Sequence, residues 1–249
     1  MKVIVITGAS RGIGKAAAIA CARRGWGVVL TYNSHPAGAV AALGEIEAEG
    51  GKAVALPLDV SRPDSFPAFR AALEQGLSDT WGRAGIDGLV NNAGIGGAVP
   101  FDRATDADFD KFLNVHLKGP YFLTQTLLPL LGEGSSIVNV SSATTRVATA
   151  GYSIYASMKG GLEVLTRYLA VELGARKIRV NTLSPGATLT DLGGGLGNYP
   201  DAVKFMASQT ALGRVGEPED VGTAIAALLS DDCGWVNAQN VEVAGGYRI

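Results

Sequence analysis

The alternation of short, wholly apolar segments with longer amphipathic ones constrains the fold of this chain more than any other feature. The first apolar segment, Val3–Ile6, is β-branched throughout and ends at Thr7-Gly8. Strands that are apolar on both faces are typical of parallel sheets covered by helices on two sides. The sequence therefore predicts an α/β fold with a doubly wound parallel sheet and helices on both faces.

The expected elements follow one another along the whole chain. Seven strands are expected, at Val3–Ile6, Val28–Tyr32, Ala53–Leu58, Ile86–Asn91, Ile137–Val140, Ile178–Leu183 and Val241–Val243. Helices are expected at Gly12–Arg24, Ala37–Glu49, Pro63–Trp81, Asp106–Leu131, 151–175, Tyr199–Ala207 and Glu219–Leu229, the fourth of them bent near Gly119-Pro120. No linker, charge block or repeat divides the chain, so we expect residues 1–249 to form one domain.

Composition excludes several classes of partner. The net charge is −2 and there is no basic stripe, so nucleic acid is not an expected partner. No apolar run approaches ~18 residues, and the N-terminal one is too short for a signal peptide, so no membrane segment is expected and the location is predicted to be cytoplasmic. Cys21 and Cys233 lie far apart, and no metal site is expected.

The regular pattern lapses between Gly186 and Gly213. The run Gly193-Gly194-Gly195-Leu196-Gly197 is too rich in glycine for a stable helix. An ordinary surface loop would explain this stretch. Its length, and its position directly after the carboxyl end of a strand, favour a mobile lid over a ligand, and we expect a substrate lid over about residues 187–213.

A glycine-rich turn joins the first expected strand to the first helix. Its spacing is G-x-x-x-G-x-G, which lets the backbone turn tightly and approach a ligand closely. The helix that follows presents free N–H groups and a positive dipole end, which together suit a pyrophosphate. The candidate phosphate-binding residues are Gly8, Ser10, Arg11, Gly12, Ile13 and Gly14.

Tyr155 and Lys159 lie four residues apart in a segment whose apolar spacing predicts a helix. They would share one helix face, so that the ammonium favours the phenolate and lowers the tyrosine pKa from about 10 toward the range of a general acid/base. Ser142, 13 residues before Tyr155, follows the expected strand 137–140, where open α/β sheets place their ligands. Such a pair alone is most often a pair of surface neighbours, so its weight depends on the rest of the chain.

Further motifs follow in a fixed order. They are Asp59-Val60 after the third strand, Asn91-Asn92-Ala93-Gly94 after the fourth, Asn114 in the long helix, and Pro185 to Thr190 after the sixth strand. With the glycine turn and Ser142, Tyr155 and Lys159, this ordered set resembles the short-chain dehydrogenase/reductases in their single-domain form. The resemblance covers the whole chain and implies a Rossmann fold. The sequence is similar to bacterial 3-oxoacyl-[acyl-carrier-protein] reductases and to sugar and alcohol dehydrogenases.

The resemblance implies four catalytic residues. Tyr155 would exchange a proton with the substrate oxygen, and Lys159 would lower the tyrosine pKa and bind the nicotinamide ribose. Ser142 would hydrogen-bond the substrate carbonyl, and Asn114 would hold a water that links Lys159 to solvent. Ser141 competes with Ser142 for the serine role and is interpreted as structural. His116 matches no family role and is interpreted as a satisfied core or interface histidine.

The resemblance also implies a cofactor site for NADP. Asp59 and Val60 would contact the adenine, Asn92, Ala93 and Gly94 the adjacent ribose, and Pro185, Gly186, Thr188 and Thr190 the nicotinamide. The end of the second strand, Leu30 to His35, lacks the acidic residue that holds the ribose 2′-hydroxyl in NAD enzymes. Arg11 would instead pair with a 2′-phosphate, assisted by Asn33 and Ser34. The expected cofactor is therefore NADPH.

The leading hypothesis is an NADP-dependent oxidoreductase that interconverts a small carbonyl compound and a secondary alcohol. One alternative is a 3-oxoacyl-[acyl-carrier-protein] reductase, for which Arg176 matches a docking position but Glu133 has the wrong sign at the other. An alternative of another class is a non-catalytic dinucleotide sensor, although such proteins usually lack the tyrosine or the lysine.

A homotetramer is also expected. The two long predicted helices, 106–131 and 151–175, carry apolar residues on more faces than one sheet can cover. These residues are Phe112, Leu117, Phe122, Leu127, Leu162, Leu165 and Leu169.

Overall fold

Seven strands form one parallel sheet in the computed structural model, which describes residues 1–249. The strand order is β3-β2-β1-β4-β5-β6-β7, so the winding reverses between β1 and β4. The strands are β1 (Val3–Ile6), β2 (Gly27–Tyr32), β3 (Ala53–Pro57), β4 (Ile86–Asn91), β5 (Leu131–Val140), β6 (Arg179–Pro185) and β7 (Asn240–Val243). All six neighbouring pairs are parallel. The predicted fold class is confirmed.

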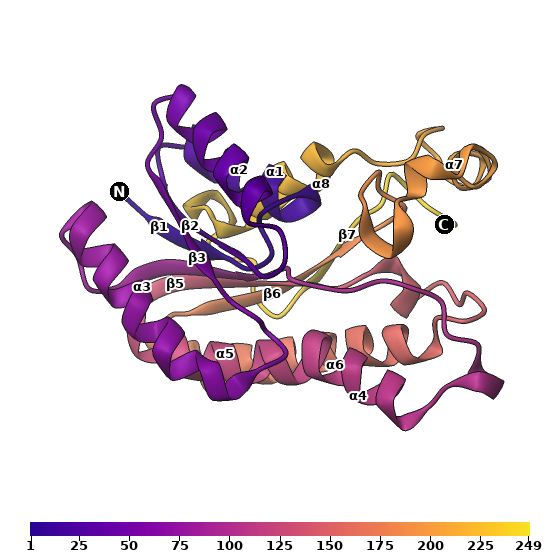
Figure 1. The fold of residues 1–249 in the computed structure, drawn as a ribbon, viewed down its shortest axis with the longest axis horizontal. Coiled ribbons are helices and arrows are strands. Elements are labelled where there is room, and N and C mark those ends of the chain that lie inside the picture. The colour runs from indigo at the N-terminus through magenta and orange to yellow at the C-terminus, as the bar shows by residue number, and fades with distance from the viewer.

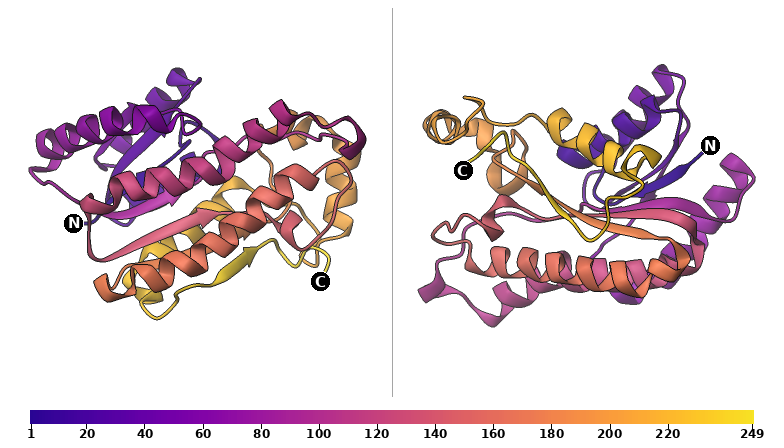
Figure 2. Two further views of the ribbon diagram at one scale, coloured as in Figure 1. Left: turned by 90° about the horizontal axis from the view of Figure 1, so that it is seen from below. Right: turned by 180° about the vertical axis from the view of Figure 1, so that it is seen from behind.

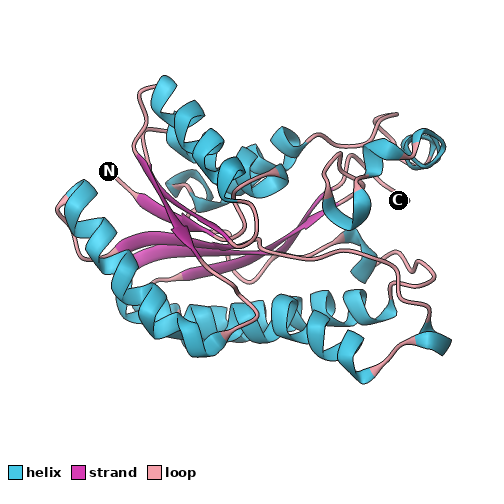
Figure 3. Cartoon of the chain, viewed as in Figure 1, coloured by secondary structure: helices cyan, strands magenta, loops and turns pink.

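Helices cover both faces of the sheet (Figures 1 and 3). They are α1 (Gly12–Arg23), α2 (Pro36–Ala48), α3 (Phe66–Trp81), α4 (Asp106–Leu113), α5 (Gly119–Leu127), α6 (Ser153–Glu172), α7 (Pro200–Ser208) and α8 (Pro218–Leu229). α1, α2 and α8 lie on one face, and α3, α5 and α6 lie on the other (Figure 2). A hydrophobic core lies on each face of the sheet, and alternate residues of β1 belong to one core or the other. Ile4 and Ile6 pack toward α1 and α8, and Val3 and Val5 pack toward α3 and α5.

The predicted long helix is interrupted earlier than expected. α4 begins at a capping box formed by Thr105 and Asp108 and ends at Leu113. A π-helical turn, Asn114–Lys118, then widens the helix, and the N–H of Gly119 donates to the carbonyl of Asn114. Pro120 has no N–H to continue an α-helical ladder from the preceding turn, and it occupies the first turn of α5, where none is needed.

The fifth strand begins earlier than predicted. It starts at Leu131 rather than Ile137, and Leu131 pairs with Ile86 before a register shift. The polar, glycine-rich residues 132–134 are exposed and interrupt the apolar pattern, which is why the sequence predicts only the buried second half of this strand.

A chain of buried polar side chains crosses the middle of the sheet beneath α5 and α6. Asn91 donates to Asn139 on the next strand at 2.8 Å and to Thr124 of α5 at 3.1 Å. Asn139 in turn donates to Thr166 of α6 at 2.8 Å, and Thr182 of β6 bonds to the same hydroxyl at 2.8 Å. We call these five residues the buried polar row. Because each partner is specific, the row fixes how both helices sit on the sheet.

The outer surface of α5 and α6 remains apolar. Tyr168 is 64 % exposed, Val171 is 81 % exposed, and Phe122 and Val164 are also exposed. Three of the residues expected to form a contact between copies, Phe112, Leu127 and Leu162, are instead buried within the chain. The apolar periodicity of these positions reflects the chain's own core. No helix in the structure is both long enough and apolar enough to span a membrane.

Candidate active site

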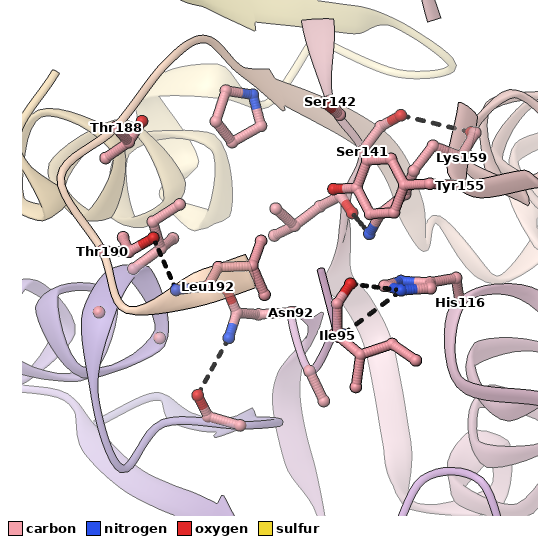
Figure 4. Close-up of a pocket in the computed structure, with 18 of the residues that line it drawn as sticks. Asn92, Ile95, His116, Ser141, Ser142, Tyr155, Lys159, Thr188, Thr190 and Leu192 are labelled. Carbon is pink, nitrogen blue, oxygen red and sulfur yellow. Dashed lines mark hydrogen bonds between the residues drawn. The ribbon is translucent and has the colours of Figure 1, made fainter. Parts of the chain in front are cut away.

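A cavity of about 500 Å³ opens at the carboxyl ends of the central strands, where the winding of the sheet reverses. In open α/β sheets this is where ligands bind. The cavity extends from the glycine turn after β1 to the segments that follow β5 and β6 (Figure 4). Its size is within the range that holds a small organic ligand.

The glycine turn allows a ligand to approach the protein backbone closely. Gly8 and Gly12 have φ values of 64° and 55°, which favour glycine. A Cβ on Gly14 would lie 2.4 Å from the carbonyl oxygen of Gly8, so α1 can approach the turn this closely only with glycine there. Gly12, Ile13 and Gly14, which begin α1, line the cavity, and no side chain caps this end of the helix. These features fit a pyrophosphate on the helix N-terminus.

Asn92 ties the end of β4 to this turn. Its side-chain amide donates to the carbonyls of Thr7 at 2.8 Å and Gly8 at 3.2 Å. The hydroxyl of Thr7 accepts the N–H groups of Asn92 and Ala93, both at 2.9 Å. The segment 92–94 and the glycine turn thus form one rigid wall of the cavity.

Near the glycine turn, the wall of the cavity carries one cationic side chain, Arg11. Arg11, Asn33 and Ser34 line it together with His35. Arg11 is exposed and lies 3.8 Å from the carboxylate of Asp191 in the predicted lid. At this exposure the pair contributes little to stability, and the guanidinium is available to an anionic ligand. No carboxylate stands at the end of β2.

Tyr155 and Lys159 are both buried on the cavity side of α6. The Lys159 Nζ donates to the carbonyl of Val140 at 2.7 Å and lies 5.6 Å from the centroid of the Tyr155 ring. Burial lowers the pKa of Lys159 to about 7. Burial raises the pKa of Tyr155 to about 12, and the neighbouring Ser142 hydroxyl offsets only part of that rise.

The expected lowering of the tyrosine pKa by Lys159 is therefore absent in the chain alone. The reason is that desolvation disfavours both charged forms, and the ammonium is directed at a backbone carbonyl rather than at the phenol oxygen. Tyr155 is protonated at neutral pH in this structure, which is the form that a proton donor requires.

Ser142 is arranged as a hydrogen-bond donor. It follows β5 directly, and its hydroxyl oxygen accepts the N–H of Thr144 at 3.2 Å and the hydroxyl of Thr144 at 3.0 Å. Its own proton is therefore left for a third partner. Ser141 points elsewhere: it donates to the carboxylate of Glu163 at 2.8 Å. That contact supports the structural interpretation of Ser141.

The interpretation of His116 as a satisfied histidine is wrong in part. Its Nε2 bonds to the carbonyl of Ile95 at 2.9 Å, whereas the buried Nδ1 has no partner (Figure 4). The ring lies against Tyr155 edge to face, with a centroid distance of 5.1 Å, and lines the cavity. Burial lowers the His116 pKa to about 2, with a further contribution from Lys159, so the ring is neutral. Asn114, in the same π-helical turn, does not line the cavity.

Every other residue predicted for the site lines this one cavity. They are Gly8, Ser10, Arg11, Gly12, Ile13, Gly14, Asn33, Ser34, Asp59, Val60, Asn92, Ala93, Gly94, Ser142, Tyr155, Lys159, Pro185, Gly186, Thr188 and Thr190. Asp59 also accepts the N–H and hydroxyl of Ser61, so the same carboxylate shapes the turn after β3. No group of three or more His, Cys, Asp or Glu side chains in the structure is placed to hold a metal ion.

Sequence reasoning did not assign several other side chains that line the cavity to the site. They are Ile95, His116, Val147, Thr149, Tyr152, Leu192, Leu196, Met206 and Tyr247. These residues belong to five separate segments, and no motif or periodicity connects them.

The fold and this site define a class: a dinucleotide-binding oxidoreductase domain of the Rossmann type. A family model described as enoyl-(acyl carrier protein) reductase matches residues 8–248. An uncharacterised oxidoreductase of Methylorubrum extorquens is 39 % identical over 99 % of this chain and 98 % of its own length. A hydroxynaphthalene reductase-like protein of Metarhizium guizhouense is 34 % identical over 98 % of this chain and 94 % of its own. The chain belongs to the short-chain dehydrogenase/reductase family.

Solved structures agree in fold along the whole chain. The promiscuous reductase LugOII, which catalyses keto-reduction at C1 during lugdunomycin biosynthesis, superposes with a TM-score of 0.95 at 34 % identity and covers 100 % of this chain and 98 % of its own. The angucycline C-6 ketoreductase LanV, solved with bound NADP, gives 0.94 at 33 % identity, with coverage of 99 % and 95 %. Both are similar to this chain in the whole arrangement of sheet and helices.

Proposed function

We propose that this protein is an NADP-dependent ketoreductase, which interconverts a ketone and a secondary alcohol with Tyr155 as the general acid/base. One observation carries the proposal. A single cavity combines a glycine cradle at a helix N-terminus with a serine proton free to donate and a protonated, buried tyrosine beside a buried lysine. The NADP-bound ketoreductase LanV supports the choice of cofactor.

In this proposal Ser142 and Tyr155 act directly on the substrate oxygen, and Lys159 and Asn114 assist Tyr155. Bound NADPH supplies the hydride that adds to the carbonyl carbon. Ser142 donates a hydrogen bond to the carbonyl oxygen and stabilises its developing negative charge. Tyr155 gives its proton to that oxygen, which completes the alcohol; in the reverse direction the phenolate takes the proton back. We further propose that Lys159 stabilises that phenolate and contacts the nicotinamide ribose, and that Asn114 connects Lys159 to solvent through water.

The walls of the substrate end favour an apolar, flat ketone. Tyr152 and Tyr247 contribute aromatic rings, and Leu192, Leu196 and Met206 contribute aliphatic surface. Aromatic and thioether groups pack well against fused rings. LanV has been solved with NADP and rabelomycin, and the curated fungal relatives are hydroxynaphthalene reductase-like. We therefore propose a fused-ring aromatic ketone as the substrate class.

Two contacts weigh against a substrate carried by acyl carrier protein. Arg176, a candidate for docking an acidic partner, donates instead to the backbone carbonyls of Leu128 and Leu131. Glu133 pairs with Lys177 at 2.5 Å on the same surface. This region offers an acidic partner no free cluster of cations.

The proposal is tested by following NADPH consumption with a panel of ketones that includes the bicyclic 2-tetralone and an acetoacetyl thioester. We expect turnover of the bicyclic ketone. Tyr155→Phe should lower kcat by at least about 100-fold, because the transferable proton is lost. NADPH affinity, measured by fluorescence, should be retained, because the ring remains. A protein that binds NADPH but consumes none with any ketone would instead support the dinucleotide-sensing alternative.

A further inference from the structure

The last five residues of the chain turn back along the predicted lid. Gly245 and Gly246 accept the N–H groups of Leu212 and Ala211, and the N–H of Arg248 donates to the carbonyl of Gln209 at 2.9 Å. A Cβ on Gly246 would lie 2.7 Å from that of Ala211, so this approach requires glycine. We call residues 245–249 the C-terminal tail. It lies beside α7, where the C-terminus is marked in Figure 1.

Arg146 fastens this tail to the loop that carries Ser142. Its guanidinium donates to the backbone carbonyls of Tyr247 at 2.7 Å and Arg248 at 2.8 Å. The remaining donors hold the carboxylate of Glu242 at the end of the sheet in a bidentate pair. One side chain therefore joins the segment after β5, strand β7 and the C-terminal tail.

Tyr247 is the tail residue that reaches the cavity. It is only 7 % exposed, and it lines the same cavity as Tyr155 and Ser142. Its hydroxyl donates to the sulfur of Met206 at 3.3 Å, and Met206, on α7, lines the cavity as well. Two side chains of the substrate end thus contact each other, one from the tail and one from the predicted lid.

We propose that Tyr247 is a specificity-determining residue that forms one wall of the substrate site, and that Arg146 is the positioning residue that holds it there. The tail and α7 then act as one unit that closes the site over a fused-ring ketone. This inference rests on the proposed ketoreductase function for its substrate. The placement of the tail is independent of that function, because it depends on hydrogen bonds within the chain.

The first test compares two ketones with matched chemistry and different size, 2-tetralone and cyclohexanone. In Tyr247→Ala we expect kcat/KM for 2-tetralone to fall by about tenfold more than for cyclohexanone, mainly through KM, because a wall that contacts the second ring is lost. Tyr247→Phe should give a smaller change in the same direction, because it keeps the ring and loses only the hydroxyl bond to Met206. An unchanged ratio between the two ketones in Tyr247→Ala would overturn the proposal.

The second test needs no turnover. Arg146→Gln should speed hydrogen exchange at the amides of Ala211 and Leu212, which the tail protects. Arg70→Gln is the matched control: Arg70 forms a partly exposed ion pair with Glu74, far from the tail in sequence, and should leave these amides unchanged. Equal protection of Ala211 and Leu212 in Arg146→Gln and wild type would overturn the role of Arg146. If wild type reduces neither ketone, the proposed function fails, and this exchange experiment still decides whether Arg146 holds the tail.

Discussion

Lys159→Met should change the stability of this protein in a way that depends on pH. Burial lowers the pKa of the Lys159 ammonium from 10.5 to about 7. Between these values the unfolded chain binds more protons than the folded one, so the stability of wild type should rise with pH across this window. The cost of burying the Lys159 amine, relative to the unfolded chain, falls from about 5 kcal/mol at pH 6, where it is buried charged, to about 2 kcal/mol at pH 9, where it is buried neutral.

Replacing Lys159 with methionine removes that cost and keeps most of the packing. It also leaves the carbonyl of Val140 without its 2.7 Å donor, which costs about 1–3 kcal/mol at every pH. Because the second term is constant, the stability advantage of the variant over wild type should shrink by about 3 kcal/mol between pH 6 and pH 9.

Urea unfolding of both proteins at one protein concentration, without dinucleotide, measures this difference. Lys111→Met serves as the control, because Lys111 is exposed and its loss should produce no comparable dependence on pH. A stability difference between Lys159→Met and wild type that is the same at pH 6 and pH 9 would refute the reasoning. It would mean that the Lys159 ammonium is solvated or already neutral throughout.

Three further outcomes are expected. Arg11→Ala should reduce kcat/KM with NADPH by at least about tenfold and leave NADH almost untouched, because a charge-assisted bond to a 2′-phosphate is lost; equal losses would remove Arg11 from cofactor selection. Burial lowers the pKa of His116 from 6.5 to about 2, so folding stability is lost as the pH falls through this window. His116→Phe should therefore move the midpoint of acid unfolding, followed by circular dichroism, to lower pH. We propose that the exposed apolar face of α5 and α6 pairs copies of the chain in a homotetramer. Light scattering should give a tetramer for wild type and a smaller species for Val171→Glu. A monomeric wild type would contradict this proposal.

Much of the fold follows from local patterns in the sequence. Unbroken apolar runs such as Val3–Ile6 are buried on both faces, and their spacing predicts all seven strands. The pattern fails where physical constraints are not local. The π-helical turn at Asn114–Lys118 depends on how Pro120 begins the next helix, and the first half of β5 is held by a pairing with Ile86 that lies 45 residues away in sequence.

The site divides in the same way. Residues that face the expected cofactor follow strand ends in a fixed order, because a dinucleotide imposes one geometry on the backbone. Residues such as Met206 and Tyr247 face the variable part of a ligand, and their meeting depends on how the tail returns to α7. The pKa of Tyr155 is a further limit: spacing predicts that Lys159 is near, but not that burial outweighs its charge.

The buried polar row has a consequence for how such a protein changes over time. Asn139 lies on β5, three residues before Ser142, which follows that strand, and Thr166 lies on α6, seven residues after Lys159. The hydrogen bond between Asn139 and Thr166 fixes the position of α6 against β5 from within the core. The residues proposed to select the substrate lie in loops, in α7 and in the tail, and none of them belongs to this row. Under the proposed function, substitutions in those segments would therefore change which ketone is accepted without altering the contacts that hold α6 against β5.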